Sequence, residues 1–238
     1  MDPKFEIASA PSLEQAAIPA SAPERRRGRA EVREYPFKRG LDILLAATLL
    51  VGLLPVAIVI AGLIGFAGKP IFFRSQRVGR GGRPFAMYKF RTMETDAERR
   101  LENYLANNPQ ARFDYACRYK LRSDPRVTRL GLFLRQFSLD ELPQLINVLK
   151  GEMSLVGPRP RLPREIADAG RYNARHFEAY YLCRPGMTGL WQVSGRADTD
   201  YHTRIRLDAI YVRQMSVLQD LAILARTIPV VLLGRGEY

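Results

Sequence analysis

The chain has 238 residues, of which 47% are hydrophobic, enough for one large domain or a domain with appendages. Its 37 lysines and arginines outnumber its 24 acids, and the formal net charge of +13 predicts an anionic partner: nucleic acid, a phosphorylated substrate or an acidic membrane surface. Two cysteines without C-x-x-C spacing and two histidines without H-E-x-x-H spacing argue against a disulfide scaffold, a zinc site and histidine-based catalysis.

The N-terminal segment, residues 1–36, mixes proline, alanine, serine, glutamate and arginine without apolar periodicity. Such a composition buries too little apolar surface to offset the conformational entropy that folding removes. We therefore expect a flexible tail, which is basic near its end at Arg25, Arg26, Arg27 and Arg29.

An uncharged segment follows and carries most of the information on location. No residue from Ile43 to Gly68 is charged, and these twenty-six residues would extend about 39 Å as one straight helix. That length exceeds the roughly 30 Å hydrocarbon core of a bilayer. The segment starts too far from the N-terminus for a signal peptide, so a membrane segment is favoured over a buried soluble helix.

Basic residues flank the uncharged segment on both sides. They are Lys38 and Arg39 before it and Arg74, Arg77, Arg80, Arg83, Lys89 and Arg91 after it. Basic flanks stay on the cytoplasmic side, so a single crossing would force one cluster outward. Pro55 interrupts the helix, and neither half alone is long enough to cross. We expect residues 37–69 to form a re-entrant helix-break-helix bent at Leu54-Pro55, with a tilted, kinked crossing as the alternative.

Residues 70–238 predict a compact cytoplasmic domain, mostly helical, with a small β-hairpin or sheet, so the fold class is α+β. Two strands are expected on either side of a turn containing Gly79, Gly81 and Gly82. Apolar residues at i, i+3, i+4 and i+7 predict a short helix that runs from about Leu142 to Lys150 and stops at Gly151.

Three further segments complete the expected elements. Asp96 to Asn107 is typical of a helix, and Pro163 to about Tyr180 has a plausible helix start. The apolar C-terminal stretch is interrupted by Asp220 and Arg226 and broken at Pro229. It is too interrupted to span a bilayer, so we expect it to pack on the core or to lie at the membrane interface.

Two adjacent acids, Asp140 and Glu141, precede the short helix in this basic chain. The simplest interpretation is structural: Ser138 and Glu141 match the S-x-x-E capping box, and Phe137 with Leu142 would form its hydrophobic staple. Pro143 argues against it, because a proline at the fifth helical position leaves an early carbonyl unpaired. A start nearer Leu142 suits Pro143 better but abandons the capping box.

The surroundings of the acid pair favour chemistry instead. Arg135 lies five residues earlier, and a rigid Gly-Pro-Arg-Pro-Arg segment holds Arg159 and Arg161 just after the helix. Arginine presents a planar fork to phosphate oxygens, aspartate can attack phosphorus to form an acyl-phosphate, and a neighbouring carboxylate helps to hold Mg²⁺. Together with the membrane segment, these residues indicate phosphate transfer at a membrane.

Several long motifs give this chain a resemblance to a known family. They are KRGLD at 38–42, YKFRTM at 88–93, SLDELPQLINVLKGEMSLVGPRP at 138–160, RPGMTGLWQVSGR at 184–196 and LDAIYV at 207–212. With them the sequence, from roughly Tyr35 to Tyr238, resembles the bacterial sugar transferases, the monotopic phosphoglycosyl transferases. The ending RTIPVVLLGRGEY is most similar to members that initiate exopolysaccharide synthesis.

The resemblance implies an activity, a cofactor and a location. The expected reaction transfers a hexose 1-phosphate from UDP-galactose or UDP-glucose to undecaprenyl phosphate, releases UMP and proceeds through a covalent aspartyl-phosphosugar. The expected cofactor is Mg²⁺, and the expected place is the cytoplasmic face of the bacterial inner membrane, in contact with its lipids. No nucleic acid is expected as a partner, and a homo-oligomer is left open.

The same resemblance assigns roles to individual residues. Asp140 corresponds to the nucleophile and Glu141 to its partner, the two together hold Mg²⁺, and Arg135 completes the catalytic set. The substrate-binding positions are Lys89, Arg91, Pro158, Arg159, Arg184, Gly186 and Arg196. Lys38 and Arg39 are expected at the membrane surface near the lipid phosphate, with Pro55 at the bend. Family members often bend at Ser-Pro, whereas Leu54 here cannot satisfy the backbone group that proline frees.

Other residues receive structural or open assignments. Trp191 is as compatible with a core anchor as with a stacking platform. Asp208 and Tyr211 are expected to be structural, the former pairing with a basic neighbour, and Arg161 and Arg164 to face lipid headgroups. Two competing functions remain: a membrane-tethered basic protein that binds an acidic polymer or nucleic acid, and a regulator that keeps the fold without catalysis. The second is disfavoured because both acids and Arg135 are present.

Overall fold

The computed structural model describes residues 34–68, 70–118, 121, 123–163, 165–166, 178–194 and 201–234. Residues 1–33 of the predicted tail, Arg164, Arg196 and most of the helix predicted from Pro163 to Tyr180 lie outside these ranges. Within them the chain is mixed, with helices and two small sheets, as the α+β prediction requires.

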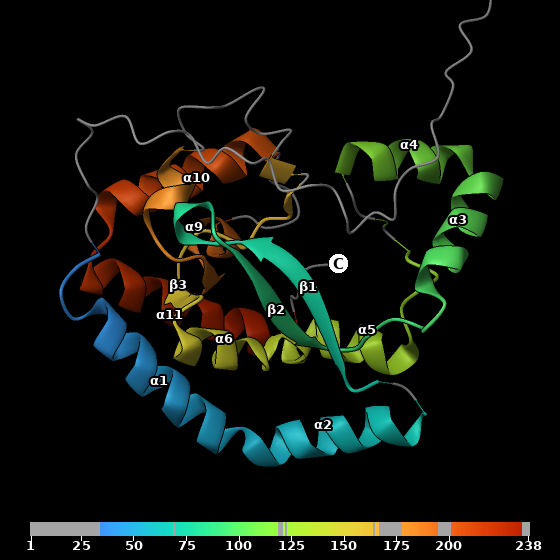
Figure 1. Ribbon diagram of the computed structural model, residues 1–238, viewed down its shortest axis with the longest axis horizontal. Helices are drawn as coiled ribbons and strands as arrows, with labels where there is room; N and C mark the ends of the chain where they lie inside the picture. The colour runs from blue at the N-terminus through green and yellow to red at the C-terminus, as the bar shows by residue number, and fades with distance from the viewer. Residues whose placement is uncertain are drawn as a thin grey trace, which may run out of the picture.

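Two consecutive helices form one edge of the molecule, α1 (Lys38–Gly52) and α2 (Leu54–Phe66) (Figure 1). No single described helix is long and apolar enough to cross a membrane, but this pair has the required length and composition jointly, bent by 59°. The break falls at Leu53, one residue before the predicted position, because Pro55 lies in the first turn of α2, where its missing N–H costs nothing.

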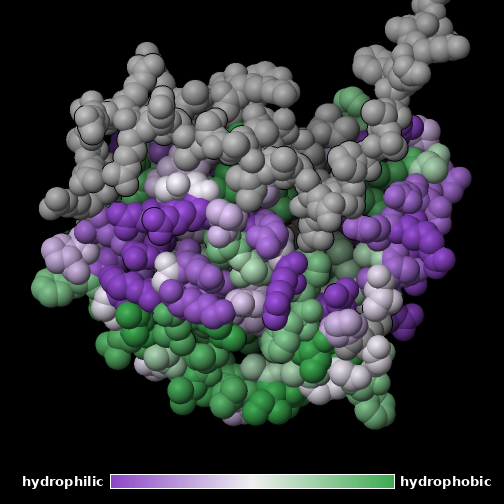
Figure 2. Space-filling view, in the orientation of Figure 1, coloured by the Kyte–Doolittle hydropathy of each residue, from purple (hydrophilic) through white to green (hydrophobic). Residues whose placement is uncertain are grey.

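The surface of this helix pair is apolar. Figure 2 shows hydrophobic side chains gathered over α1 and α2, with polar surface above them. The exposed fractions are large, for example 72% for Val51, 62% for Ile58 and 97% for Phe66. A contiguous apolar face of this kind marks a membrane or protein contact rather than ordinary solvent-exposed surface.

An antiparallel hairpin follows, β1 (Phe72–Val78) and β2 (Pro84–Phe90), as predicted. Its register runs from Phe72 opposite Phe90 to Val78 opposite Pro84. A one-turn 3₁₀ helix, η1 (Arg80–Gly82), closes the turn, in which Gly81 has a φ of 67° that side chains disfavour. The odd-numbered residues of both strands share one face, and that face becomes a wall of the candidate site.

A helical arm extends from the hairpin and returns to it (Figure 1). It contains α3 (Ala97–Asn107), which was predicted, and α4 (Pro109–Arg118), which was not. Helix α5 (Arg129–Gln136) begins at Thr128, whose side chain accepts a hydrogen bond from the Gly131 N–H. Short η2 (Leu139–Glu141) and α6 (Gln144–Lys150) follow, and α6 ends at Gly151 as predicted, with a φ of 84°.

The C-terminal half supplies the second sheet and two long helices. Its parallel strands are β3 (Ser154–Val156) and β4 (Gly186–Thr188), and its helices are η3 (Glu178–Leu182), α9 (Leu190–Val193), α10 (Tyr201–Gln214) and α11 (Val217–Leu232). The predicted break at Pro229 is wrong, because α11 continues to Leu232. Proline in the last turn removes one hydrogen bond of a helix that is otherwise held by apolar packing.

The main core joins α1 to the rest of the domain. Ala46 of α1 is completely buried against a cluster that includes Val148 of α6, Val212 of α10 and Ile223 of α11. A smaller cluster connects α2 to the hairpin and to α5; its buried members are Ile60, Ile64, Phe90 and Leu134. The bent helix pair is therefore packed onto the domain along both of its halves.

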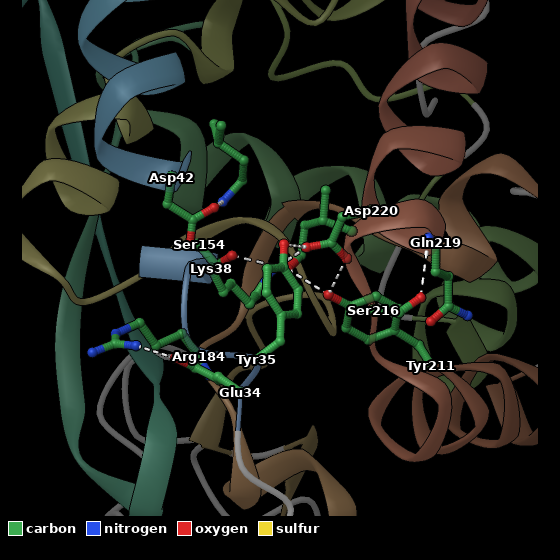
Figure 3. Close-up of polar contacts among 12 residues, drawn as sticks. Glu34, Tyr35, Lys38, Asp42, Ser154, Arg184, Tyr211, Ser216, Gln219 and Asp220 are labelled. Carbon is green, nitrogen blue, oxygen red and sulfur yellow. Dashed lines mark hydrogen bonds and ion pairs between the residues drawn. The ribbon is translucent and has the colours of Figure 1, made fainter. Parts of the chain in front are cut away.

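A buried polar network fixes the first turn of α1 (Figure 3). The Lys38 ammonium donates to Asp220 of α11 at 2.5 Å and to the Val156 carbonyl oxygen at 3.0 Å. The hydroxyls of Tyr35 and Tyr211 lie 2.8 and 2.7 Å from the same carboxylate. Lys38 is only 1% exposed, so its predicted place at the membrane surface is wrong: an ammonium with this many acceptors is held inside the protein.

Two arginines, Arg39 and Arg161, also have internal partners. Arg39 donates to the Val148 and Leu149 carbonyl oxygens at 2.6 and 2.9 Å, so its guanidinium caps the C-terminus of α6. Arg161 was expected to face lipid, but it is buried and forms an ion pair with Asp208 at 2.7 Å. The structural assignment of Asp208 is thereby confirmed, including its basic partner.

Candidate active site around Asp140 and Glu141

The backbone turns sharply just before the acid pair. Ser138 has φ 55° and ψ 22°, the left-handed region, which costs an L-residue about 1–2 kcal/mol. Its side chain makes no capping hydrogen bond, and α6 begins only at Gln144 with Pro143 as its N-cap. The predicted capping box is therefore wrong, because the turn at Ser138 directs both acids away from the helix start and into a separate 3₁₀ turn.

Lys89 bridges the two acids from β2. Its ammonium lies 2.6 Å from Glu141 Oε1 and 3.5 Å from Asp140 Oδ2. Asp140 is 6% exposed, and this burial raises the pKa of its carboxyl. The charge of Lys89 opposes the shift, the charge of Glu141 adds to it, and that of Arg135 opposes it. A carboxylate held by a cation in a buried site suits a nucleophile.

Arg135 reaches the acids from the last turn of α5. Its Nε donates to Thr92 Oγ1 at 3.0 Å, and burial lowers the pKa of the guanidinium while the charge of Asp140 opposes that shift. The close approach of α5 to Thr92 requires Gly131, since an added Cβ would lie 2.1 Å from the Thr92 carbonyl oxygen. This glycine therefore helps to place Arg135 beside the acid pair.

A cavity of about 710 Å³ opens over these residues. Six sequence-predicted site residues line it: Lys89, Arg91, Arg135, Asp140, Glu141 and Arg159. The opposite wall is the start of the α3–α4 arm, from Glu94 to Arg99 with Tyr115. The volume is that of a typical small-molecule site, and its floor carries both carboxylates and several cations.

Other predicted substrate-binding residues lie elsewhere. Arg184 lines a second cavity of about 530 Å³ beside the hairpin turn, where its guanidinium forms an ion pair with Glu34. Gly186 is buried, and a Cβ there would lie 2.0 Å from the Gly157 nitrogen. The Pro158 carbonyl accepts from the Gly186 N–H at 2.8 Å, so these two residues form a tight backbone crossing rather than a ligand contact.

The structure resolves the open assignment of Trp191. The indole is 1% exposed, with the guanidinium carbons of Arg159 and Arg204 at 5.7 and 4.7 Å from its ring centroid. These are cation–π distances, and Trp191 also lines the main cavity, so it is a buried anchor that supports Arg159 at the cavity wall.

Sequence analysis missed several residues that line the cavity: Phe73, Ser75, Arg77, Met87, Tyr115, Arg126 and Gln192. The signal for the first four was present. Phe73 pairs with Lys89, Ser75 with Met87 and Arg77 with Phe85, so the two-residue period of the strands places Arg77 on the same face as Lys89. No such periodicity links Tyr115 or Arg126 to the site, because both come from the arm.

The acid pair is compatible with a magnesium ion. Mg²⁺ is commonly bound through one or two carboxylates, with water and substrate phosphate oxygens completing the octahedron, and Asp140 and Glu141 offer that donor set. Among the described residues no group of three or more histidine, cysteine or acidic side chains forms an all-protein metal cage. The two carboxylates therefore fit a magnesium site whose coordination is completed only when the substrate is bound.

Comparison with known proteins gives a consistent set of relatives. Residues 33–234 match the family described as bacterial sugar transferase. The exopolysaccharide production protein ExoY of Sinorhizobium fredii is 45% identical over 202 residues, which cover 84% of this chain and 88% of that protein. The UDP-glucose:undecaprenyl-phosphate glucose-1-phosphate transferase of Caulobacter vibrioides is 40% identical over 209 residues, covering 84% of this chain and 72% of that protein.

A third relative is longer. The undecaprenyl-phosphate galactose phosphotransferase of Salmonella typhimurium is 46% identical over 202 residues, which cover 85% of this chain but only 42% of that protein. The chain thus spans most of the first relative's length and less than half of this one.

Proposed function

This chain belongs to the bacterial sugar transferase family, and we propose that it transfers a hexose 1-phosphate from UDP-galactose or UDP-glucose to undecaprenyl phosphate, releasing UMP. The observation that carries the proposal is the Asp140–Glu141 pair, bridged by Lys89 and facing a cavity that six arginines help to line. Anionic substrates explain the cations, and an apolar bent helix pair beside the site explains access to a lipid acceptor.

The first half-reaction forms a bond between Asp140 and phosphorus. An Asp140 carboxylate oxygen attacks the phosphate that carries the sugar, the bond to the bridging oxygen breaks, and UMP leaves with the electron pair. Lys89 holds the attacking carboxylate, and Arg135, which Thr92 positions, draws the phosphate oxygens toward it. Burial excludes water from a carboxylate that would otherwise be hydrated.

The second half-reaction restores the enzyme. A phosphate oxygen of undecaprenyl phosphate attacks the same phosphorus, the acyl-phosphate bond breaks, and Asp140 returns to its carboxylate form. Glu141 and Asp140 would hold Mg²⁺, which when bound screens the negative charges of the reacting phosphates. The remaining interactions come from the protein: Arg159, supported by Trp191, adds a planar fork for phosphate oxygens.

The covalent step is testable without the lipid. We expect the full-length protein, incubated with UDP-galactose or UDP-glucose and Mg²⁺, to release UMP once and to gain the mass of a hexose phosphate on the peptide containing Asp140. The Asp140→Asn variant should lose the adduct and turnover, whereas Glu102→Gln, at an exposed position of α3 outside the cavity lining, should keep both. An unmodified wild-type peptide together with normal turnover in Asp140→Asn would exclude the mechanism, and a protein that only binds acidic polymers would release no UMP.

The placement of the bent pair α1–α2 in the membrane is part of the same proposal. A re-entrant arrangement leaves both of its flanks in the cytoplasm of a bacterium, at the inner membrane. We expect single cysteines at Glu31 and Gln76, in a background with Cys117 and Cys183 changed to serine, to react with an impermeant maleimide only after the cells are opened. Labelling of one position in intact cells would show a true crossing.

A further inference from the structure

Arg77 is the one residue of β1 that brings a cation to the cavity without an acidic partner of its own. Its Nη1 donates to the Pro160 carbonyl oxygen at 3.1 Å, whereas its Nε is buried and has no acceptor within the described part of the chain. Arg161, which is buried and forms a backbone bridge with Val78, the residue after Arg77, differs because it has Asp208 at 2.7 Å. Buried charges are normally paired, so the free donor of Arg77 has to be explained.

The electrostatic surroundings of Arg77 confirm that its charge is poorly compensated. Burial lowers the pKa of its guanidinium, the charges of Glu165 and Glu141 oppose that shift, and Arg159 adds to it by repulsion. None of the described carboxylates forms an ion pair with Arg77. An anion placed in the cavity would reduce this imbalance, because its charge would lie beside both Arg77 and Arg159, which line the same cavity.

The position of Arg77 relative to the acid pair indicates which anionic group it would bind. Arg77 lines the main cavity and also a smaller adjoining one, together with Glu141, Gln144 and Arg159. Asp140 and Arg135 line only the main cavity, whereas Arg77 and Glu141 line both cavities. Arg77 therefore lies toward Glu141, the member of the acid pair that is not the nucleophile.

We propose that Arg77 binds the phosphate of the departing UMP moiety and neutralises the charge that develops on it. The inference rests on the proposed function. In an in-line displacement the attacking and leaving oxygens lie on opposite sides of phosphorus, so the leaving phosphate lies away from Asp140. Strand β1 and the contact with the Pro160 carbonyl hold Arg77 at the wall of the cavity, where an arginine can offer further N–H donors to phosphate oxygens.

An arginine could equally bind the phosphate of the lipid acceptor. Measuring the two half-reactions separately distinguishes the phosphate of UMP from that of the lipid. Arg77→Gln removes the charge, Arg77→Lys keeps a charge without the planar fork, and Arg74→Gln is the control. Arg74 lies on the same strand, is exposed and stacks on Tyr88 outside the cavity. UMP binding is measured by calorimetry on the full chain in detergent, and adduct formation by quenched mass spectrometry.

We expect Arg77→Gln to bind UMP at least 10-fold more weakly and to form the adduct about 10²–10³-fold more slowly, the usual loss when one charge-stabilising donor is removed. Arg77→Lys should fall between Arg77→Gln and wild type, and Arg74→Gln should equal wild type. If Arg77→Gln does not fold, the comparison of Arg77→Lys with wild type decides, since a merely structural role would not weaken UMP binding.

Two results would overturn the proposal. One is wild-type UMP affinity and adduct rate in a folded Arg77 variant. The other is a defect confined to transfer from preformed adduct to undecaprenyl phosphate, which would assign Arg77 to the lipid phosphate. Failure of the proposed function looks different: wild-type protein would form no adduct, while UMP binding would still report on Arg77.

Discussion

Asp140 lies between two opposing influences, burial that favours its neutral form and the charges of Lys89 and Arg135 that favour its carboxylate. Burial is the larger, so the pKa of the carboxyl is above its ordinary value near 4. Only the carboxylate attacks phosphorus. The rate of adduct formation should therefore fall as the pH is lowered through this raised pKa, earlier than for an exposed aspartate.

Replacing Lys89 should shift the pH at which the rate of adduct formation falls. Lys89→Met removes the charge nearest to both acids, so the pKa of Asp140 rises further and the half-maximal pH of adduct formation shifts upward. The measurement is single-turnover adduct formation between pH 4 and 9 (roughly the range of protein stability). An unchanged midpoint in Lys89→Met, with only a lower plateau, would show that Lys89 serves substrate binding alone.

Residue type alone did not separate the cations of the candidate site from structural ones. Lys38, Arg161 and Arg184 have the same charge as Lys89 and Arg159, yet they form ion pairs with acids that do not line the main cavity. Those acidic partners belong to distant elements, and a local pattern contains no information on them. Asp140 and Glu141, in contrast, were predicted as site residues from a motif that is long and continuous.

Among the elements, the β3–β4 pair shows how a predicted ligand residue becomes a packing residue. Gly186→Ala would place a Cβ against the Gly157 backbone, which cannot move without separating the strands. We expect a loss of about 1–3 kcal/mol in unfolding free energy, as for other overpacked sites. Thermal unfolding in detergent measures it.

Gly62→Ala in α2 is the matched control, because no atom lies within 4 Å of its added Cβ. It should leave the unfolding midpoint unchanged or raise it, since alanine favours a helix by roughly 1 kcal/mol over glycine. Equal stability of Gly186→Ala and wild type, combined with a raised KM for UDP-sugar, would restore the substrate-binding role predicted for Gly186.

Element prediction succeeded where the signal is local. The β-hairpin, α3 and the end of α6 at Gly151 follow from glycine turns and apolar spacing. It failed at Ser138, whose left-handed backbone no serine preference indicates, and at Pro229, where α11 continues to Leu232 although proline removes one hydrogen bond. Tertiary contacts decide such places.

On the scale of the whole molecule, the ion pair between Lys38 and Asp220 joins the first described helix to the last. Asp220→Asn would leave the buried ammonium without a counter-charge, and we expect a loss of about 3–5 kcal/mol. The double variant Lys38→Met with Asp220→Leu should lose less than Asp220→Asn, because it buries no unpaired charge. Chemical unfolding in mild detergent measures the unfolding free energy of wild type and of the two variants. Equal losses of unfolding free energy in both variants would contradict this account.

The arrangement of the bent pair α1–α2 relative to the site followed from the sequence only in part. Its uncharged length and basic flanks predicted a bent helix pair, which is confirmed at 59°. The closeness of that pair to the acid pair was not encoded locally. It results from the packing of α2 against two residues. Phe90 lies on the same strand as Lys89, and Leu134 lies on the same helix as Arg135.

The pairing of Lys38 with Asp220 also sets an order of events during biosynthesis. The two residues are 182 positions apart, so at roughly 5–20 residues per second the ribosome adds Asp220 on the order of 10–40 s after Lys38. Until then the ammonium has to stay hydrated, although α1 and α2 have both been synthesised. Under the membrane placement proposed above, the helix pair would reach the lipid before Lys38 meets its counter-charge, and a chain released before Asp220 would keep this lysine unpaired.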